Sequence, residues 1–366
     1  MSLSIGIVGL PNVGKSTLFN ALTKKGAETA NYPFCTIDPS VGVVTVPDER
    51  LYKLADFSKT LRTIPAIVEF VDIAGLVKGA SEGQGLGNKF LTNIRETDAI
   101  AEVVRIFEDS EIIHVDGKID PVHDIEVINM ELILADLQTV TNREQNLLRD
   151  VKRGDKLAIK EDGLVKQLRA VLESEKLANT LVLTDPEEQK IVKQLNLLTM
   201  KPFLYILNKK AGGRNLDEMD DPRFAALLAY LKEHHATYVI VDARISEELN
   251  AFEGEERKQF ADELGVKDDG IDKLIRAGYD LLGLMMYFTT GVQETRAWTI
   301  KRNSTAPVAG MAIHTDFKDK FIRAEIVNWE ALINAGSYAA AREKGLVRTE
   351  GKEYVVQDGD VIEFKI

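Results

Sequence analysis

The sequence predicts an α/β fold in three parts, and three observations support this prediction. An apolar run that ends at Gly9 is followed by a short glycine-containing loop and a helix-like stretch. Two long amphipathic stretches separate later apolar strands, and short β-rich segments follow from Gly291 onward. A chain of 366 residues is too long for one small core, so we expect an α/β domain, an inserted helical hairpin and a small mixed C-terminal domain.

Composition restricts the location and the partners of the chain. No apolar run approaches the ~20 residues of a membrane span, and the start of the sequence lacks the layout of a signal peptide. Cys35 is the only cysteine, which excludes an intrachain disulfide and a cysteine-based zinc site. We therefore expect a cytoplasmic location, no membrane and no disulfide partner. The net charge of −12 also disfavours indiscriminate binding to nucleic acid.

The first loop has the spacing of a phosphate-binding motif. Residues 9–16 read G-x-x-x-x-G-K-S, and an apolar strand before them and a helix after them are the setting that this motif requires. Gly14 lets the backbone turn so that its N–H groups point at phosphate oxygens. Lys15 is expected to reach the β- and γ-phosphates as a catalytic residue, and Ser16 to coordinate Mg²⁺. The loop residues predicted to bind a nucleoside triphosphate are Asn12, Val13, Gly14, Lys15, Ser16 and Thr17.

Two later segments are typical of nucleotide switches. Thr36 lies in a proline-flanked loop, where a threonine is either exposed to solvent or closes over Mg²⁺ and the γ-phosphate. Asp72 ends an apolar strand, the position of a second carboxylate linked to Mg²⁺. Gly75 allows its N–H to approach the γ-phosphate without a Cβ in the way. We expect Ser16, Thr36 and Asp72 to form the metal site.

The residue that would position the attacking water is less evident. Leu76 stands where many GTPases carry a glutamine, and leucine neither donates nor accepts a hydrogen bond. His114, in a loop region after a predicted strand, is a candidate to hold this water. The alternative is a surface or packed histidine without a catalytic role.

The base-reading position departs from the guanine-specific pattern. A strand over residues 201–207 ends in Asn208-Lys209-Lys210-Ala211, where guanine-reading proteins carry N-K-x-D. Ala211 has no acceptor for the base, so the sequence predicts no strict guanine specificity. Asn208 and Lys209 are expected to pack against the purine. A further strand over residues 237–241 brings Asp242 and Ala243 to the same end.

The remaining chain supplies the inserted and C-terminal parts. Residues 124–150 and the stretch around residues 164–172 have helical periodicity and predict a hairpin, either a spacer or a docking arm. Residues 270–287 look like another helix, before the β-rich tail. The predicted boundaries are 1–123 and 200–282 for the two pieces of the nucleotide-binding domain, 124–199 for the hairpin, and 283–366 for the C-terminal domain.

These motifs together resemble the Obg-like ATPase (YchF) family of P-loop proteins over essentially the whole chain. The matching segments are residues 9–17, 31–36, 72–80, 90–91, 94–96, 276–279, 296–300, 313–317, 321–324 and 358–361. The resemblance implies a Ras-like nucleotide domain, an inserted coiled-coil domain and a C-terminal TGS domain of β-grasp type. It also implies a hydrophobic residue, Leu76, in place of the catalytic glutamine. Asn12 then matches an asparagine that helps K⁺ to neutralise charge, and His114 falls in a family segment linked with water positioning.

Members of that family accept ATP and associate with ribosomes in translation or stress response. By resemblance, the chain is expected to be a slow Mg²⁺-dependent ATPase that acts as a switch on the ribosome or ribosomal RNA. The family usually carries N-x-x-E at the base-reading position, and Ala211 departs from that pattern as well. Two alternatives remain: a GTP-binding translation factor, and a nucleotide-stabilised scaffold with little hydrolysis.

Overall fold

The computed structural model describes residues 3–24, 40–73, 88–109, 119–252, 254–264, 266 and 268–366. These residues form two compact units. The first unit contains the described residues of 3–24, 40–42 and 69–274, and the second contains residues 43–68 and 275–366. No helix in the described part of the chain combines the length and apolar character needed to cross a membrane.

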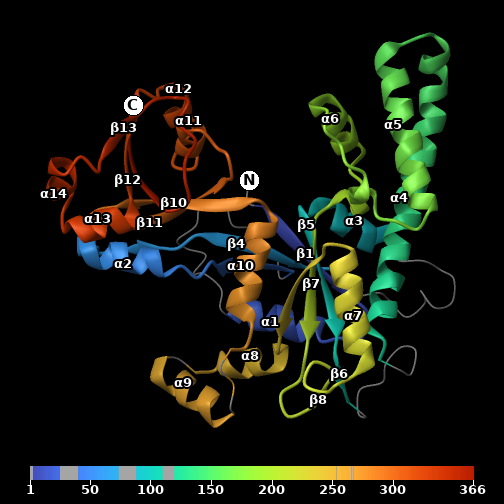
Figure 1. The fold of residues 1–366 in the computed structure, drawn as a ribbon, viewed down its shortest axis with the longest axis horizontal. Helices are drawn as coiled ribbons and strands as arrows, with labels where there is room; N and C mark the ends of the chain where they lie inside the picture. The colour runs from blue at the N-terminus through green and yellow to red at the C-terminus, as the bar shows by residue number, and fades with distance from the viewer. Residues whose placement is uncertain are drawn as a thin grey trace. The chain divides into compact units, whose positions relative to one another are not determined.

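A six-stranded sheet forms the centre of the first unit (Figure 1). In spatial order its strands are β2 (Val41–Thr45), β4 (Ile67–Asp72), β1 (Ser4–Gly9), β5 (Ala99–Arg105), β7 (Phe203–Asn208) and β9 (Thr237–Val241). The pairings of β1 with β4 and β5, and of β7 with β5 and β9, are parallel. Strands β1, β5 and β7 are almost completely buried, as expected for parallel strands covered on both faces.

Parallel pairing brings the carboxyl ends of these strands to one edge of the sheet. The register places Ile7 opposite Asp72, Arg105 opposite Asn208, and Asn208 opposite Val241. Ligands of open α/β sheets bind outside this edge. The α/β prediction is therefore confirmed, and the predicted loop and strand-end residues lie on the same side of the sheet.

Helices and a short ladder complete the nucleotide part of the first unit. The helices are α1 (Lys15–Lys24), α3 (Asn88–Glu96), α7 (Pro222–Glu233), α8 (Ala243–Leu249) and α9 (Gly254–Glu263). The ladder pairs β6 (Phe107–Glu108) with β8 (Arg214–Asn215). Asp221 and Asp242 begin α7 and α8 as N-caps, because their carboxylates accept backbone N–H bonds that the first turn cannot satisfy.

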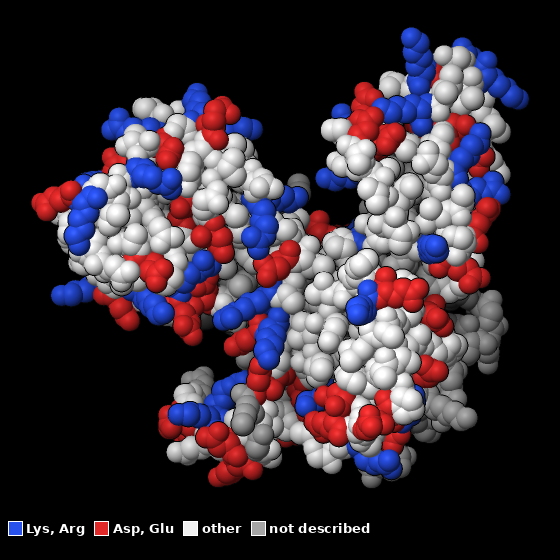
Figure 2. All heavy atoms as spheres, in the orientation of Figure 1, with Lys and Arg blue, Asp and Glu red and all other residues white. Residues whose placement is uncertain are grey.

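The predicted helical insertion is present. Helices α4 (Pro121–Lys152) and α5 (Lys156–Glu173) lie side by side and are joined by a turn at Gly154, whose φ is +78°. Asp155 caps α5 by accepting the N–H groups of Leu157 and Ala158. Figure 2 shows Lys and Arg side chains at the far end of this hairpin. The shorter elements that follow are η3 (Ala178–Thr180), α6 (Pro186–Leu195) and η4 (Leu198–Met200).

A buried carboxylate ties the hairpin to the end of the insertion. Asp136 of α4 is fully buried and accepts hydrogen bonds from Leu198 N at 3.0 Å and from Thr199 N and Oγ1, both at 2.7 Å. Burial raises the pKa of Asp136, while these donors act in the opposite direction. The contact satisfies two backbone donors of the 3₁₀ helix η4 inside the protein.

A second buried carboxyl group lies between the sheet and α4. Glu102 of β5 has 1% of its surface exposed, and neither carboxyl oxygen has a hydrogen-bond partner among the described residues. Burial, with a contribution from the nearby Asp124, raises the pKa of Glu102 well above its ordinary value. This interior position therefore favours the neutral acid.

The second unit contains its own six-stranded sheet. In spatial order its strands are β13 (Arg348–Glu350), β12 (Arg323–Asn328), β14 (Asp360–Lys365), β10 (Leu284–Thr290), β11 (Thr295–Lys301) and β3 (Thr63–Ile64). Its helices are α2 (Glu49–Ser58), α11 (Ala306–Gly310), α12 (Asp316–Asp319), α13 (Trp329–Ala335) and α14 (Tyr338–Glu343). Strand β3 and helix α2 come from the N-terminal third of the chain, so the second unit is not one continuous stretch.

The helix expected over residues 270–287 is only partly present. Helix α10 (Ile271–Leu281) ends before Gly283, whose φ of +66° favours glycine, and β10 begins at Leu284. The expectation of a helix through Tyr287 was therefore wrong. Residues 284–288 are an apolar run, and periodicity alone does not separate a buried strand from a buried helix in such a run.

Candidate nucleotide-binding site

The loop between β1 and α1 has a backbone conformation that depends on Gly14. Gly14 has φ of +92°, and a Cβ there would collide with the side-chain amide of Asn208. Gly9 is also confined, because a Cβ would lie 2.9 Å from Val13 Cγ2 and 3.0 Å from Val103 O. Neither position of the motif has room for a Cβ, and the φ angle of Gly14 also favours glycine.

Lys15 and Asp72 meet at this loop. The Lys15 ammonium donates to Asp72 Oδ1, and the two side chains are 10% and 25% exposed. Asp72 is further held by its backbone N–H, which donates to Ser40 O at 2.7 Å. A phosphate group that takes Lys15 must therefore compete with this carboxylate. Ser16, the first-turn residue predicted to bind Mg²⁺, is exposed beside Lys15.

A cavity of about 300–1,000 Å³ is typical of sites for small ligands, and one of ≈ 680 Å³ opens next to the loop. Six of the predicted binding residues line it: Asn12, Gly14, Thr17, Asn208, Lys209 and Ala243. The structure therefore brings together the loop after β1 and the residues that follow β7 and β9. Val13 is buried beneath the loop, and Asp242 is buried as the N-cap of α8.

Asn208 joins three parts of this site. Its side chain is 3% exposed, donates from Nδ2 to Val13 O at 2.8 Å, and accepts from Ala243 N at 3.1 Å. Both ends of the amide are therefore used within the protein. Asn208 fixes the phosphate loop to the start of α8, which sequence reasoning did not anticipate.

The two lysines after Asn208 are held by acidic neighbours. Lys209 Nζ donates to Glu218 Oε1 at 2.8 Å, and the Lys210 ammonium bonds Asp109. Burial acts to lower the pKa of Lys209, but the bond to Glu218 and nearby carboxylates raise it overall. With their charges anchored, the aliphatic stems of Lys209 and Lys210 line the cavity.

The two residues after the strand ends where a base would be read, Ala211 and Asp242, offer few free acceptors. Ala211 is exposed and has no polar side-chain atom. Asp242 accepts from Ile245 N at 3.0 Å, and its Oδ2 is buried with no hydrogen-bond partner among the described residues. Burial raises the pKa of Asp242. Its carboxylate is thus committed to capping α8 through one oxygen.

The cavity also has walls that the motif analysis did not single out. These residues are Lys24, Phe107, Lys210, Arg244, Glu247, Glu248 and Ala251. Phe107 lies just beyond the end of β5, and Asn208 ends the neighbouring strand β7. The guanidinium of Arg105 lies 4.6 Å from the ring centre of Phe107. Its place just beyond a central strand was the signal available in the sequence. Glu247 is one helical turn after Ala243, so it shares a face of α8 with a predicted residue.

Three predicted site residues lie outside the described part of the chain. They are Thr36, Gly75 and His114, and Leu76 lies outside it as well. Among the residues that the structure does describe, no group of three or more His, Cys, Asp or Glu side chains could hold a metal ion. The roles given to Thr36, Gly75 and His114 remain predictions.

Comparisons with known proteins agree with the motifs. Residues 4–143 match the family model described as "50S ribosome-binding GTPase", and residues 284–366 match the YchF-GTPase_C model, described as "Protein of unknown function (DUF933)". A protein named "Ribosome-binding ATPase YchF" from Bacillus subtilis is 53% identical, covering 100% of this chain and 99% of the relative. Proteins of that name from Haemophilus influenzae and Escherichia coli O157:H7 are 50% and 49% identical over the same shares.

A solved structure supports the same assignment. The structure titled "Structure of the Schizosaccharomyces pombe YchF GTPase" is 37% identical and superposes with a TM-score of 0.88, covering 100% of this chain and 98% of that chain. Identity at this level over the full length of several relatives is shared across both units and the helical insertion. The chain belongs to the YchF family of P-loop nucleoside triphosphatases.

Proposed function

We propose that this chain is a ribosome-binding ATPase that hydrolyses ATP slowly and acts as a nucleotide-dependent switch in translation or stress response. The observation that carries the proposal is the cavity of ≈ 680 Å³ beside the phosphate loop, lined by Asn12, Gly14 and Thr17 of that loop and by Asn208, which ties the loop to α8. The names of the full-length relatives add the ribosome as partner. A cytoplasmic location fits such a partner.

The predicted residues would bind the phosphates, sense the γ-phosphate and position the attacking water. Backbone N–H groups of residues 12–17 and the N-terminus of α1 would hold the phosphates, and the Lys15 ammonium would exchange Asp72 for a phosphate oxygen. Thr36 and Gly75 would sense the γ-phosphate, and His114 would hold the attacking water in place of a glutamine. Because Leu76 cannot orient water, we expect a low intrinsic rate that the ribosome raises.

The donor set near Lys15 suits Mg²⁺. The Ser16 hydroxyl and the Asp72 carboxylate are hard oxygen ligands, and Mg²⁺ is usually held by one or two such groups with phosphates and waters completing its shell. That requirement agrees with a site that has no three-residue acidic cluster among the described residues. When bound, Mg²⁺ would neutralise charge that develops on the phosphates, and K⁺ near Asn12 would add to this effect.

Single-turnover hydrolysis of ATP with and without ribosomes tests the proposal. A slow rate for the protein alone and a clear increase with ribosomes are expected, together with loss of hydrolysis in Lys15→Ala. Co-sedimentation with ribosomes in the apo, diphosphate and non-hydrolysable triphosphate states separates the switch from a scaffold. Equal ribosome binding in all three states would contradict a switch.

A GTPase is the second candidate, because one matching model and the fission yeast structure carry that name. Calorimetric titration with ATP and GTP in K⁺ and Na⁺ buffers decides between the bases and tests the cation. We propose that ATP is preferred, since Ala211 offers no acceptor to the guanine N1–H and amino groups. Ala211→Asp should shift preference toward GTP by about ten- to a hundredfold. This is the effect expected when the new carboxylate accepts hydrogen bonds that guanine donates and adenine does not.

The boundaries given above for the nucleotide, hairpin and C-terminal domains are part of the same proposal. Limited proteolysis followed by mass spectrometry would test them, with cleavage expected near residues 123, 200 and 283 before cleavage within the domains.

A further inference from the structure

Residues 43–68 group with the second unit, although they begin in β2 and end in β4, two strands of the sheet described for the first unit. Strand β3 forms an edge of the C-terminal sheet by parallel pairing with β11. Just before β3, Leu61 N donates to Val292 O at 2.9 Å, and Thr295 N donates to Arg62 O at 3.0 Å. This segment is therefore part of the C-terminal sheet and not a loop resting on it.

Hydroxyl groups attach the end of α2 to the same sheet. Ser58 Oγ lies 2.7 Å from Thr290 Oγ1, and Thr60 Oγ1 lies 2.6 Å from Thr295 Oγ1. Thr290 and Thr295 are themselves joined at 2.7 Å across the β10–β11 hairpin. The C-terminal end of α2 is thus held by a continuous set of short polar contacts.

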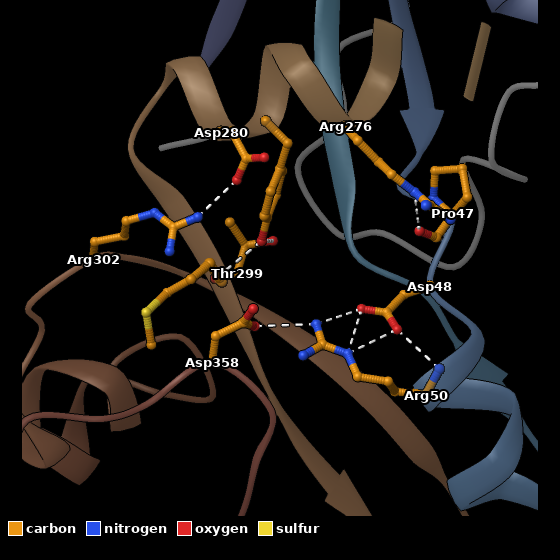
Figure 3. A network of polar contacts seen from close by, with 10 residues as sticks. Pro47, Asp48, Arg50, Arg276, Asp280, Thr299, Arg302 and Asp358 are labelled. Atoms are coloured by element: carbon orange, nitrogen blue, oxygen red, sulfur yellow. Dashed lines mark hydrogen bonds and ion pairs between the residues drawn. The ribbon is translucent and has the colours of Figure 1, made fainter. Parts of the chain in front are cut away.

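Arg50 attaches the start of α2 (Figure 3). Its guanidinium bonds both carboxylate oxygens of Asp48, with Nη2 to Oδ2 at 2.6 Å, and its Nη2 also bonds Asp358 Oδ1 at 3.1 Å. It lies 5.3 Å from the ring centre of Phe288. Gly359 leaves room for it, since a Cβ there would stand 3.0 Å from Arg50 Nη1. Asp48, Arg50 and Asp358 are called the Arg50 clamp below.

The clamp borders a polar hollow and not a packed apolar core. A cavity of ≈ 450 Å³ is lined by residues of α2, α10, β10 and the loop before β14. In it, Arg276 Nε donates to Pro47 O at 3.2 Å, and Arg302 Nη2 donates to Asp280 Oδ1 at 2.7 Å (Figure 3). Polar contacts around open space exchange partners at lower cost than close-packed side chains do.

The other end of this segment leads to the phosphate loop. Val46 N donates to Ala66 O at 2.8 Å, which ties the two ends of residues 46–66 together where β4 begins. Strand β4 then runs without interruption to Asp72, the partner of Lys15. A phosphate that draws Lys15 away releases Asp72, the last residue of β4, from its bond to Lys15.

We infer that residues 43–68 carry the occupancy of the phosphate site to the C-terminal domain, with Arg50 as the positioning residue that holds α2 to that domain. This inference rests on the proposed nucleotide binding. Freeing Asp72 shifts β4 at its carboxyl end, and the attachment of α2 and β3 to the C-terminal sheet converts that shift into a change of partners within that sheet. Neither Arg50 nor Asp358 is a residue that would touch the nucleotide.

The protein contains its own reporter for this change. Its two tryptophans, Trp298 and Trp329, both lie in the second unit. Lys53 of α2 lies 5.7 Å from the ring centre of Trp329, and Trp329 N donates to Gly359 O at 3.1 Å. The indole of Trp329 therefore contacts the segment and adjoins the Arg50 clamp. A nearby ammonium group that moves alters indole emission.

The test is a titration of the full-length protein with a non-hydrolysable ATP analogue and Mg²⁺, followed by tryptophan fluorescence and, separately, by calorimetry. The wild type should change its emission on saturation, and Trp329→Phe should lose that change. Arg50→Ala and Asp358→Asn should bind the analogue within about fivefold of the wild type, the range set by one partly exposed ion pair, and lose most of the emission change. Circular dichroism melting confirms that each variant is folded, and Asp358→Asn alters the least volume.

Arg302→Ala and Asp280→Asn are the matched controls. They break an ion pair at the same cavity that does not involve residues 43–68, and they should keep the emission change. An unaltered response in both Arg50→Ala and Asp358→Asn overturns the inference, as does a wild type that binds the analogue without any emission change. Failure to bind nucleotide in calorimetry would instead overturn the proposed function, and this inference with it.

Discussion

Glu102 gives the sharpest prediction, because its carboxyl group is buried without a hydrogen-bond partner among the described residues. Its pKa lies well above the ordinary 4.5, chiefly through burial. The folded protein therefore holds this proton over a pH range in which the unfolded chain has lost it. Stability from this group is complete below the unfolded pKa and is lost as pH rises through the folded pKa.

The magnitude follows from linkage. Within the window between the two pKa values, one extra bound proton in the folded state costs about 1.4 kcal/mol of stability per pH unit. Glu102→Gln has nearly the same shape and does not titrate. The variant should therefore gain stability on the wild type as the pH rises above the unfolded pKa of 4.5, with a slope that approaches about 1.4 kcal/mol per pH unit once the unfolded carboxyl is mostly ionised.

Hydrogen exchange followed by mass spectrometry is the suitable assay, because a chain with two units need not unfold in one step. Protection of β5 amides is compared between variant and wild type at the same pH, so the intrinsic exchange rates cancel. Glu126→Gln is the matched control, since Glu126 is an exposed carboxylate on the adjacent α4. Parallel pH profiles for wild type and Glu102→Gln would refute the assignment of a neutral buried acid.

Three further predictions concern local structure. Gly14→Ala should abolish nucleotide binding in calorimetry, because the φ of +92° and the Asn208 amide both exclude a Cβ, and retention of wild-type affinity would show that the loop adapts. Asp136→Ala should lower the stability of the hairpin by about 2–4 kcal/mol in urea unfolding, because it leaves buried N–H groups of Leu198 and Thr199 unpaired, whereas a loss below about 1 kcal/mol would contradict that role. Asn208→Ala should weaken nucleotide binding about tenfold or more in calorimetry through loss of the bonds to Val13 and Ala243, with Asn215→Ala, which loses local bonds only, as the comparison.

Much of the fold was predictable because local signals agreed with each other. The loop at residues 9–16 stands between an apolar strand and a helix, and β1 and α1 flank it as expected. The hairpin followed from helical periodicity, and its turn at Gly154 from the glycine itself. The end of β7 at Asn208 was visible as the end of an apolar run.

The remainder depended on contacts between distant residues. The side-chain amide of Asn208 makes hydrogen bonds to Val13 and Ala243, and no pattern near residue 208 predicts these partners. Strand β3 has two residues, too few for a periodic signal, and only its pairing with β11 defines it. Glu102 looked like an ordinary charged residue in a strand, and only burial of β5 on both faces makes it unusual.

The placement of β3 at the edge of the C-terminal sheet bears on how this domain can be cut out or exchanged. A fragment that starts at residue 284 would expose the backbone of β11 along the length that β3 covers, and bare strand edges recruit other chains. We expect such a truncate to aggregate, and a fusion that restores residues 61–64 beside β11 to be soluble. An exchange of this domain between family members should likewise succeed only if residues 61–64 are transferred together with residues 284–366, so that β3 and β11 come from the same parent.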